Sequence, residues 1–130
     1  MVNILLNNRY CLYKFDLHRK KEATVEIIRS EGTRMGYSDQ GEGEAVVLLH
    51  GFCGSSDYWE RVAPLLSGSC RVIAPDLRGH GTTDAPKGAY TMEQMADDVL
   101  SLIDALELPK VTLLGHSLGG YVTLSFAQRY

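Results

Sequence analysis

Residues Val111–Val122 read VTLLGHSLGGYV, an apolar run that passes into a serine flanked by glycines and then becomes apolar again. A short run of β-branched and apolar residues is typical of a buried strand, and the residues after the glycines fit a helix. Turning from strand to helix within so few residues strains the backbone at the middle residue, and the glycines remove Cβ atoms that would clash there. The stretch therefore predicts that the hydroxyl of Ser117 is exposed above the end of a strand.

Gly115, His116, Ser117, Leu118 and Gly119 match Gly-x-Ser-x-Gly, the pattern of a nucleophile elbow. The helix that follows directs free N–H groups toward the serine, so the N–H of Leu118 can stabilise an oxyanion. A pattern with only three fixed positions occurs by chance in roughly one such chain in ten. The surrounding sequence must therefore decide whether this one marks a nucleophile. The alternative interpretation is a glycine-rich turn in which Ser117 only caps the helix.

A second loop follows another apolar run, AVVLLH (45–50), which is typical of a central strand buried on both faces of a parallel sheet. The run ends at His50 and is followed by Gly51 and Phe52. Gly51 lets the backbone turn in closely, which makes the N–H of Phe52 a candidate second oxyanion donor. Two donors from separate loops would then converge on one oxygen atom.

Further strands are predicted on both sides of this central run. TVEIIR (24–29) and RMGYSD (34–39) favour an antiparallel hairpin turned at Glu31-Gly32-Thr33, and CRVIAP (70–75) favours another strand of the sheet. Together with VTLL (111–114), these runs predict a mostly parallel sheet with an antiparallel hairpin at its start.

Helices are expected between the strands. Asp57 with Glu60 predicts a capping box and a helix that crosses back over the sheet, and Thr91 with Gln94 predicts another capping box. Apolar residues recur three and four apart after Thr91 until Pro109. Strands that alternate with helices in this way predict an α/β fold, with helices on both faces of the sheet.

Three motifs together resemble the α/β-hydrolase family, in its branch with a His-Gly-x oxyanion loop. They are LLHGFCGSS (48–56), PDLRGHGTTD (75–84) and GHSLGG (115–120), and they occur in family order over Glu42–Tyr130. The resemblance implies that Ser117 is the nucleophile and that the N–H groups of Phe52 and Leu118 form the oxyanion hole. It implies supporting roles for the neighbouring motif residues, which are His50, Gly51, Gly115, His116 and Gly119.

The second motif, PDLRGHGTTD, resembles the loop that follows the fourth strand in the family. We expect Asp76, Arg78 and His80 to order this loop through charge-assisted hydrogen bonds rather than to take part in catalysis. Family members commonly have a serine at the position of Thr83, so the hydroxyl is kept although the residue differs.

A catalytic base is not evident. The family order is nucleophile, acid and then histidine, but the four histidines are His18, His50, His80 and His116, and none follows Ser117. We therefore expect residues 24–130 to be the N-terminal part of the domain, truncated before the acid and the histidine, and inactive alone. Residues 1–23 are expected to be an extension outside the core that is either non-native or disordered, with an ordered extra strand as the alternative.

Composition and charge exclude several classes of protein. The 130 residues are 45% apolar with a net charge of −3, and their interspersed charges give no basic stripe for nucleic acid and no cluster for a membrane surface. No apolar run is long enough to span a bilayer. Cys11, Cys53 and Cys70 suggest neither a disulfide scaffold nor a zinc site, which favours the cytoplasm. No cofactor or metal is implied, and the oligomeric state stays open.

The resemblance implies a carboxylesterase-like hydrolase that acts on a small ester-like molecule. Lactonases, C–C bond hydrolases and cofactor-free haloperoxidases keep the same serine and remain alternatives, whereas epoxide hydrolases and haloalkane dehalogenases use aspartate there. A non-catalytic binding protein of the same fold is a further alternative. A nucleotide-binding domain is disfavoured, because GFCGSS (51–56) lacks the Walker lysine and no G-x-G-x-x-G follows a strand.

Overall fold

The computed structural model describes residues 3–7, 10–14, 25–30 and 33–130 of the chain. It contains seven strands and three α-helices among these residues, with one 3₁₀ helix, η1. The strands are β1 (Asn3–Asn7), β2 (Tyr10–Lys14), β3 (Val25–Ser30), β4 (Thr33–Gln40), β5 (Ala45–Leu49), β6 (Arg71–Pro75) and β7 (Val111–Gly115). The helices are η1 (Ser56–Trp59), α1 (Ala63–Leu66), α2 (Met92–Ala105) and α3 (Leu118–Arg129).

Five strands form one mixed sheet in the order β3-β4-β6-β5-β7. β3 and β4 are an antiparallel hairpin, and β4 is also antiparallel to β6. β5 lies between β6 and β7 and is parallel to both. The predicted hairpin, central strand and parallel pairing are confirmed, while the two antiparallel pairings make the sheet mixed.

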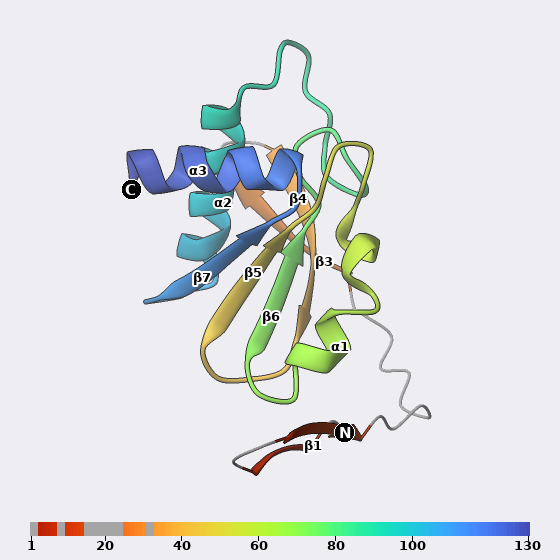
Figure 1. The fold of residues 1–130 in the computed structure, drawn as a ribbon. Helices are drawn as coiled ribbons and strands as arrows, with labels where there is room; N and C mark the ends of the chain where they lie inside the picture. Colours follow the sequence, from red (N-terminus) through yellow and green to blue (C-terminus); the bar gives the residue numbers. More distant parts are fainter. Residues whose placement is uncertain (1–2, 8–9, 15–24, 31–32) are drawn as a thin grey trace.

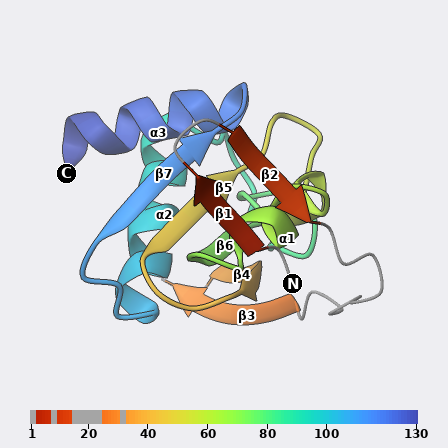
Figure 2. The ribbon, with the colours of Figure 1, turned by 60° about the horizontal axis from the view of Figure 1, so that its bottom comes forward.

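Helices cover both faces of this sheet, as predicted (Figures 1 and 2). Because neighbouring residues of a strand point to opposite faces, Val47 and Leu49 pack with α2 and α3, whereas Leu48 packs with α1 and η1. The larger core contains the buried side chains of α2 that the periodicity picked out, namely Met95, Val99 and Leu102. The helices thereby fix the positions of the loops at the strand ends.

The two predicted capping boxes have different outcomes. At Thr91 both hydrogen bonds are present, since the side chain of Thr91 accepts from the N–H of Gln94 and the side chain of Gln94 accepts from the N–H of Thr91. The predicted box at Asp57 was wrong, because Ser55 is the N-cap and its hydroxyl accepts from the N–H of Asp57.

The single helix expected after Asp57 is replaced by η1 and the short α1. Pro64 lies at the start of α1, where a residue without an N–H is tolerated, but inside a longer helix it would remove a hydrogen bond. The proline therefore divides the connection into two short pieces.

At the N-terminus, β1 and β2 form a separate antiparallel hairpin. The predicted boundary between residues 23 and 24 lies outside the described residues, as do Glu31 and Gly32 of the predicted turn. No helix in the described ranges is both long and apolar enough to cross a membrane.

Candidate active site

Three loops meet at the carboxyl ends of the parallel strands β5, β6 and β7. The chain leaves β5 for β6 on one side through η1 and α1, and then reaches β7 on the other side of β5 through α2. Such a reversal of direction leaves a crevice at the strand ends, which is where ligands bind in open α/β sheets. The loops after β5, β6 and β7 carry Phe52, Asp76 and Ser117, respectively.

Ser117 stands at the turn between β7 and α3 with a strained backbone. Its φ is 53° and its ψ is −112°, a conformation that residues with a side chain rarely adopt. Its side chain is exposed and makes no capping hydrogen bond. The alternative interpretation, in which this serine only caps the helix, therefore lacks the hydrogen bond that it requires.

Both glycines of the elbow are required by close backbone contacts. A Cβ atom on Gly115 would lie 2.2 Å from the carbonyl oxygen of Gly119, and a Cβ atom on Gly119 would lie 2.2 Å from that of Leu49. Neither distance can be relieved by moving a side chain, because each obstacle is backbone. The elbow is therefore packed directly against the end of β5.

Backbone hydrogen bonds tie the elbow to the loop after β5. The N–H of His116 donates to the carbonyl of Leu49 at 3.0 Å, and the N–H of Gly119 donates to the carbonyl of His50 at 3.1 Å. Gly51 follows immediately, and a Cβ atom there would lie 3.4 Å from the Cβ of Ser117. The loop that carries Phe52 thus passes beside the serine.

The two candidate oxyanion donors lie in these adjoining loops. Among the described residues, neither the N–H of Phe52 nor the N–H of Leu118 donates a hydrogen bond within the protein. Leu118 is the first residue of α3, where helical N–H groups have no partner in their own helix. Both groups are therefore available to an external acceptor.

His50 is fully buried and holds two loops together. Its Nε2 receives a hydrogen bond from the N–H of Leu77 at 2.9 Å, and its Nδ1 lies 2.8 Å from the carbonyl oxygen of Gly51. Burial lowers the pKa of this imidazole, and the nearby His80 lowers it further. With both nitrogens engaged, His50 supports the loop and has no free nitrogen for Ser117.

Asp76 is the acceptor around which the loop after β6 is built. Its carboxylate receives hydrogen bonds from the N–H of Ser56 at 2.6 Å and from the N–H and hydroxyl of Thr82 at 2.8 and 2.9 Å. Burial would raise the pKa of Asp76, but these hydrogen bonds outweigh it and the pKa lies below its ordinary value.

The predicted charge-assisted network of this loop is present. Arg78 makes two hydrogen bonds to the buried carboxylate of Asp98 on α2, at 2.8 and 2.6 Å. The Thr83 hydroxyl donates to the carbonyl of Asp76 at 2.6 Å, so the hydroxyl that threonine keeps at this position makes a hydrogen bond within the loop. His80 lies edge-on to His50 at 5.1 Å between ring centroids.

Sequence reasoning missed two residues that contact the predicted site. Thr82 donates to Asp76, although the motif had drawn attention to Thr83. Tyr58 of η1 stacks on His116, with ring centroids 4.9 Å apart and planes inclined by 20°. No periodicity or motif could indicate the stacking, since it joins residues in different loops.

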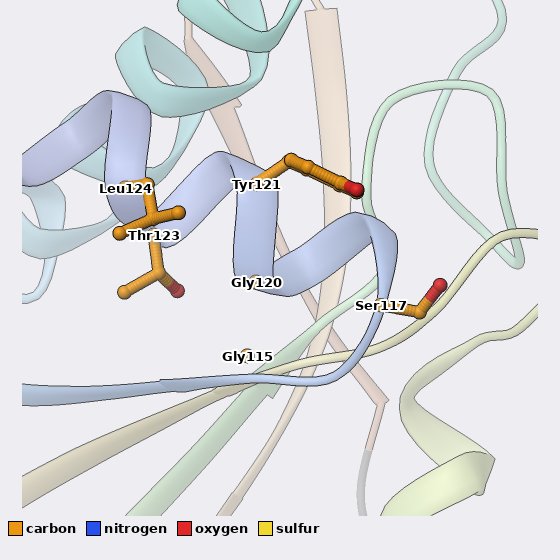
Figure 3. Close-up of a pocket in the computed structure, with 6 residues that line it drawn as sticks. All are labelled: Gly115, Ser117, Gly120, Tyr121, Thr123 and Leu124. Carbon is orange, nitrogen blue, oxygen red and sulfur yellow. The ribbon is translucent and has the colours of Figure 1, made fainter.

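A hollow of about 450 Å³ lies along α3 and β7 (Figure 3). Its lining residues are Gly115, Ser117, Gly120, Tyr121, Thr123 and Leu124. In Figure 3 the Ser117 hydroxyl points away from Thr123 and Leu124. The nucleophile candidate thus sits at one end of the hollow and faces out of it. No cluster of His, Cys, Asp or Glu suited to a metal ion occurs among the residues whose structure is described.

The chain is similar in sequence to one protein family and to several enzymes. The family model described as alpha/beta hydrolase fold matches residues 44–130. A putative 2-succinyl-6-hydroxy-2,4-cyclohexadiene-1-carboxylate synthase of Bacillus subtilis is 42% identical over 82% of this chain. A soluble epoxide hydrolase of a Corynebacterium species is 43% identical over 82%, and a 2-hydroxy-6-oxo-2,4-heptadienoate hydrolase of Pseudomonas putida is 40% identical over 80%.

Solved structures of other proteins also resemble the chain, in both fold and sequence. A thermophilic esterase from Thermogutta terrifontis superposes with a TM-score of 0.75 at 39% identity, over 82% of this chain and 40% of that one. An enzyme described as degrading N-acyl homoserine lactones superposes with a TM-score of 0.78 at 30% identity, over 81% and 40%. The chain spans only 37–40% of the length of the three curated relatives.

Proposed function

This chain belongs to the alpha/beta hydrolase family, and we propose that it carries the nucleophile and oxyanion hole of a serine hydrolase. Ser117 is the nucleophile, and the N–H groups of Phe52 and Leu118 hold the oxyanion. The observation that carries the proposal is the strained backbone of Ser117, whose hydroxyl caps no helix. Strain of this kind persists where the surrounding structure over-determines it, as the packing around Gly119 does here.

The proposed reaction is acyl transfer to water. The oxygen of Ser117 attacks an ester carbonyl while a histidine takes its proton, and the alcohol leaves with that proton to give an acyl-serine. Water then attacks the acyl group, the histidine takes a proton from the water, and the acid is released as Ser117 regains its hydrogen. The two N–H donors hold the negative oxygen in each tetrahedral intermediate.

Catalysis in the whole protein requires a base, which the family order places after Ser117. His50 has both nitrogens engaged, and no histidine follows Ser117 within residues 1–130. We propose that residues 24–130 are the N-terminal part of the catalytic domain, that the acid and histidine come from residues outside these 130, and that residues 1–130 alone are inactive. Residues 1–23 are proposed to be an extension outside the catalytic core.

A small carboxylic ester is the proposed substrate class. The likeness to a solved esterase supports it, as does serine at the position where epoxide hydrolases use aspartate. Lactones and C–C bonds adjacent to a carbonyl are the alternatives that the same nucleophile serves, and the likeness to an enzyme described as degrading N-acyl homoserine lactones supports the first of them. We propose that the reaction needs no cofactor, metal, nucleic acid or membrane, and takes place in the cytoplasm.

An activity-based probe tests the proposal directly. The whole protein is treated with a fluorophosphonate, and the labelled residue is identified by mass spectrometry of peptides. We expect labelling at Ser117, none after Ser117→Ala, and none of residues 1–130 expressed alone. Ester hydrolysis by the whole protein that persists after Ser117→Ala would overturn the assignment, and a whole protein that the probe does not label would overturn the serine mechanism.

A further inference from the structure

We infer that Tyr58 is a positioning residue for this site, because its ring, stacked on His116, holds the elbow against the loop that carries Phe52. The inference rests on the proposed function, since it concerns the placement of the two oxyanion donors. Tyr58 belongs to η1, in the connection between β5 and β6, whereas His116 directly precedes Ser117.

His116 is exposed, and its imidazole lies close to two parts of the connection between β5 and β6. The ring of Tyr58 stacks on it at 4.9 Å between centroids. The backbone at Gly51 is also close to this ring, because a Cβ atom on Gly51 would lie 2.9 Å from Nδ1 of His116. The imidazole therefore lies near both the start of the Phe52 loop and the ring of Tyr58.

Tyr58 is itself supported from the core. Its ring meets the ring of Trp59 edge-on at 5.0 Å, and Trp59 is buried with Leu48 and Val72 in the smaller core. The hydrogen bond from the N–H of Ser56 to Asp76 fixes the start of η1 as well. A continuous series of ring contacts thus runs from the smaller core through Trp59 and Tyr58 to His116.

The position of Tyr58 favours a role in placement over a role in stability. Half of Tyr58 is exposed, at 51%, so the burial of its ring stabilises the fold less than that of a core residue. Its ring nevertheless contacts the residue next to the nucleophile. The oxyanion must accept from two N–H groups in different loops, and a misplacement of about 1 Å at such a site lowers the rate about a hundredfold.

Substitutions in the whole protein test this role. Tyr58→Ala removes the ring, Tyr58→Leu keeps apolar bulk without stacking, and Tyr58→Phe is the matched control that keeps the ring. For a small chromogenic ester, we expect Ala and Leu to lower kcat about tenfold or more per probe-reactive serine, with little change in KM. Tyr58→Phe should keep kcat close to that of the unsubstituted protein.

A second measurement tests the stacking without catalysis. In protein labelled with ¹³C-histidine, the ring protons of His116 should be shifted upfield by the tyrosine ring. Tyr58→Leu should abolish this shift and Tyr58→Phe should keep it. This readout applies to Tyr58→Leu even if Tyr58→Ala fails to fold.

The outcomes separate this inference from the proposed function. If the unsubstituted protein labels at Ser117 and Tyr58→Leu keeps kcat, the positioning role is overturned and the serine mechanism stands, whether or not the shift of His116 is lost. A fall in thermal stability with unchanged kcat overturns it too. If Ser117 does not label in the unsubstituted protein, the proposed function fails and this inference fails with it.

Discussion

The N–H of Leu77 donates a hydrogen bond to Nε2 of His50 at 2.9 Å, and so joins the loop after β6 to the loop after β5. A backbone N–H can only donate, so Nε2 carries no proton and the hydrogen of the neutral imidazole is on Nδ1. That hydrogen is donated to the carbonyl of Gly51, 2.8 Å away. One buried side chain therefore fixes the loop beside Ser117 through a defined tautomer.

The stability of the whole protein should depend on pH through His50. Burial lowers the pKa of His50 below 6.5, so the unfolded chain binds this proton more tightly than the folded protein does. The contribution is fully present above 6.5 and is lost as the pH falls toward the lowered value. Urea unfolding over this interval should show a smaller pH dependence for His50→Gln. Equal slopes for both proteins would contradict the prediction.

Asp76→Asn should destabilise the whole protein by about 2–4 kcal/mol, because the new amide group meets donors where the carboxylate accepted hydrogen bonds. The lowered pKa of Asp76 adds stability above its ordinary value of 3.8, which is lost as the pH falls through the folded value. Denaturant unfolding near neutral pH measures the difference. Asp104→Asn, on an exposed part of α2, is the control and should change stability little. A similar loss in both variants would refute the special role of Asp76.

Ser117→Gly should stabilise the fold by about 1 kcal/mol relative to Ser117→Ala. Glycine adopts positive φ without the steric cost that any Cβ atom incurs at 53°, and alanine keeps that cost. Both substitutions should abolish labelling by the fluorophosphonate. Thermal unfolding of the two variants tests the prediction, and a glycine variant no more stable than the alanine variant would show that the strain is small.

Two adjacent glycines should respond in opposite ways to alanine. Gly119→Ala brings a Cβ atom to 2.2 Å from the carbonyl of Leu49 and should cost about 3 kcal/mol or more. In Gly120→Ala the nearest atom is 3.5 Å away, so the higher helix propensity of alanine should stabilise α3 by up to about 1 kcal/mol. Denaturant unfolding of both variants gives the comparison. Equal effects would mean that the elbow is not packed against β5 as described.

Local pattern was sufficient for most of the fold. Apolar runs such as AVVLLH predicted strands, and the polar pair Thr91 and Gln94 predicted the start of α2, because these features depend on neighbours a few residues apart. The prediction at Asp57 was wrong because two nearby residues offered the same local signal. Ser55 and Asp57 both suit the start of a helix, and Ser55 took the cap while Pro64 divided what followed.

The sequence by itself determined the succession of β3 to β7 along the chain with α2 and α3, the sharp turn at Ser117 and the two loops with candidate donors. Only the tertiary structure decided which distant side chains meet at that turn. Leu77 lies 27 residues from His50, and Tyr58 and His116 come from different connections, yet each pair is in contact. The physical reason is that β5, β6 and β7 end at one edge of the sheet, so their loops converge there. Such contacts depend on how the layers pack, which no local pattern encodes.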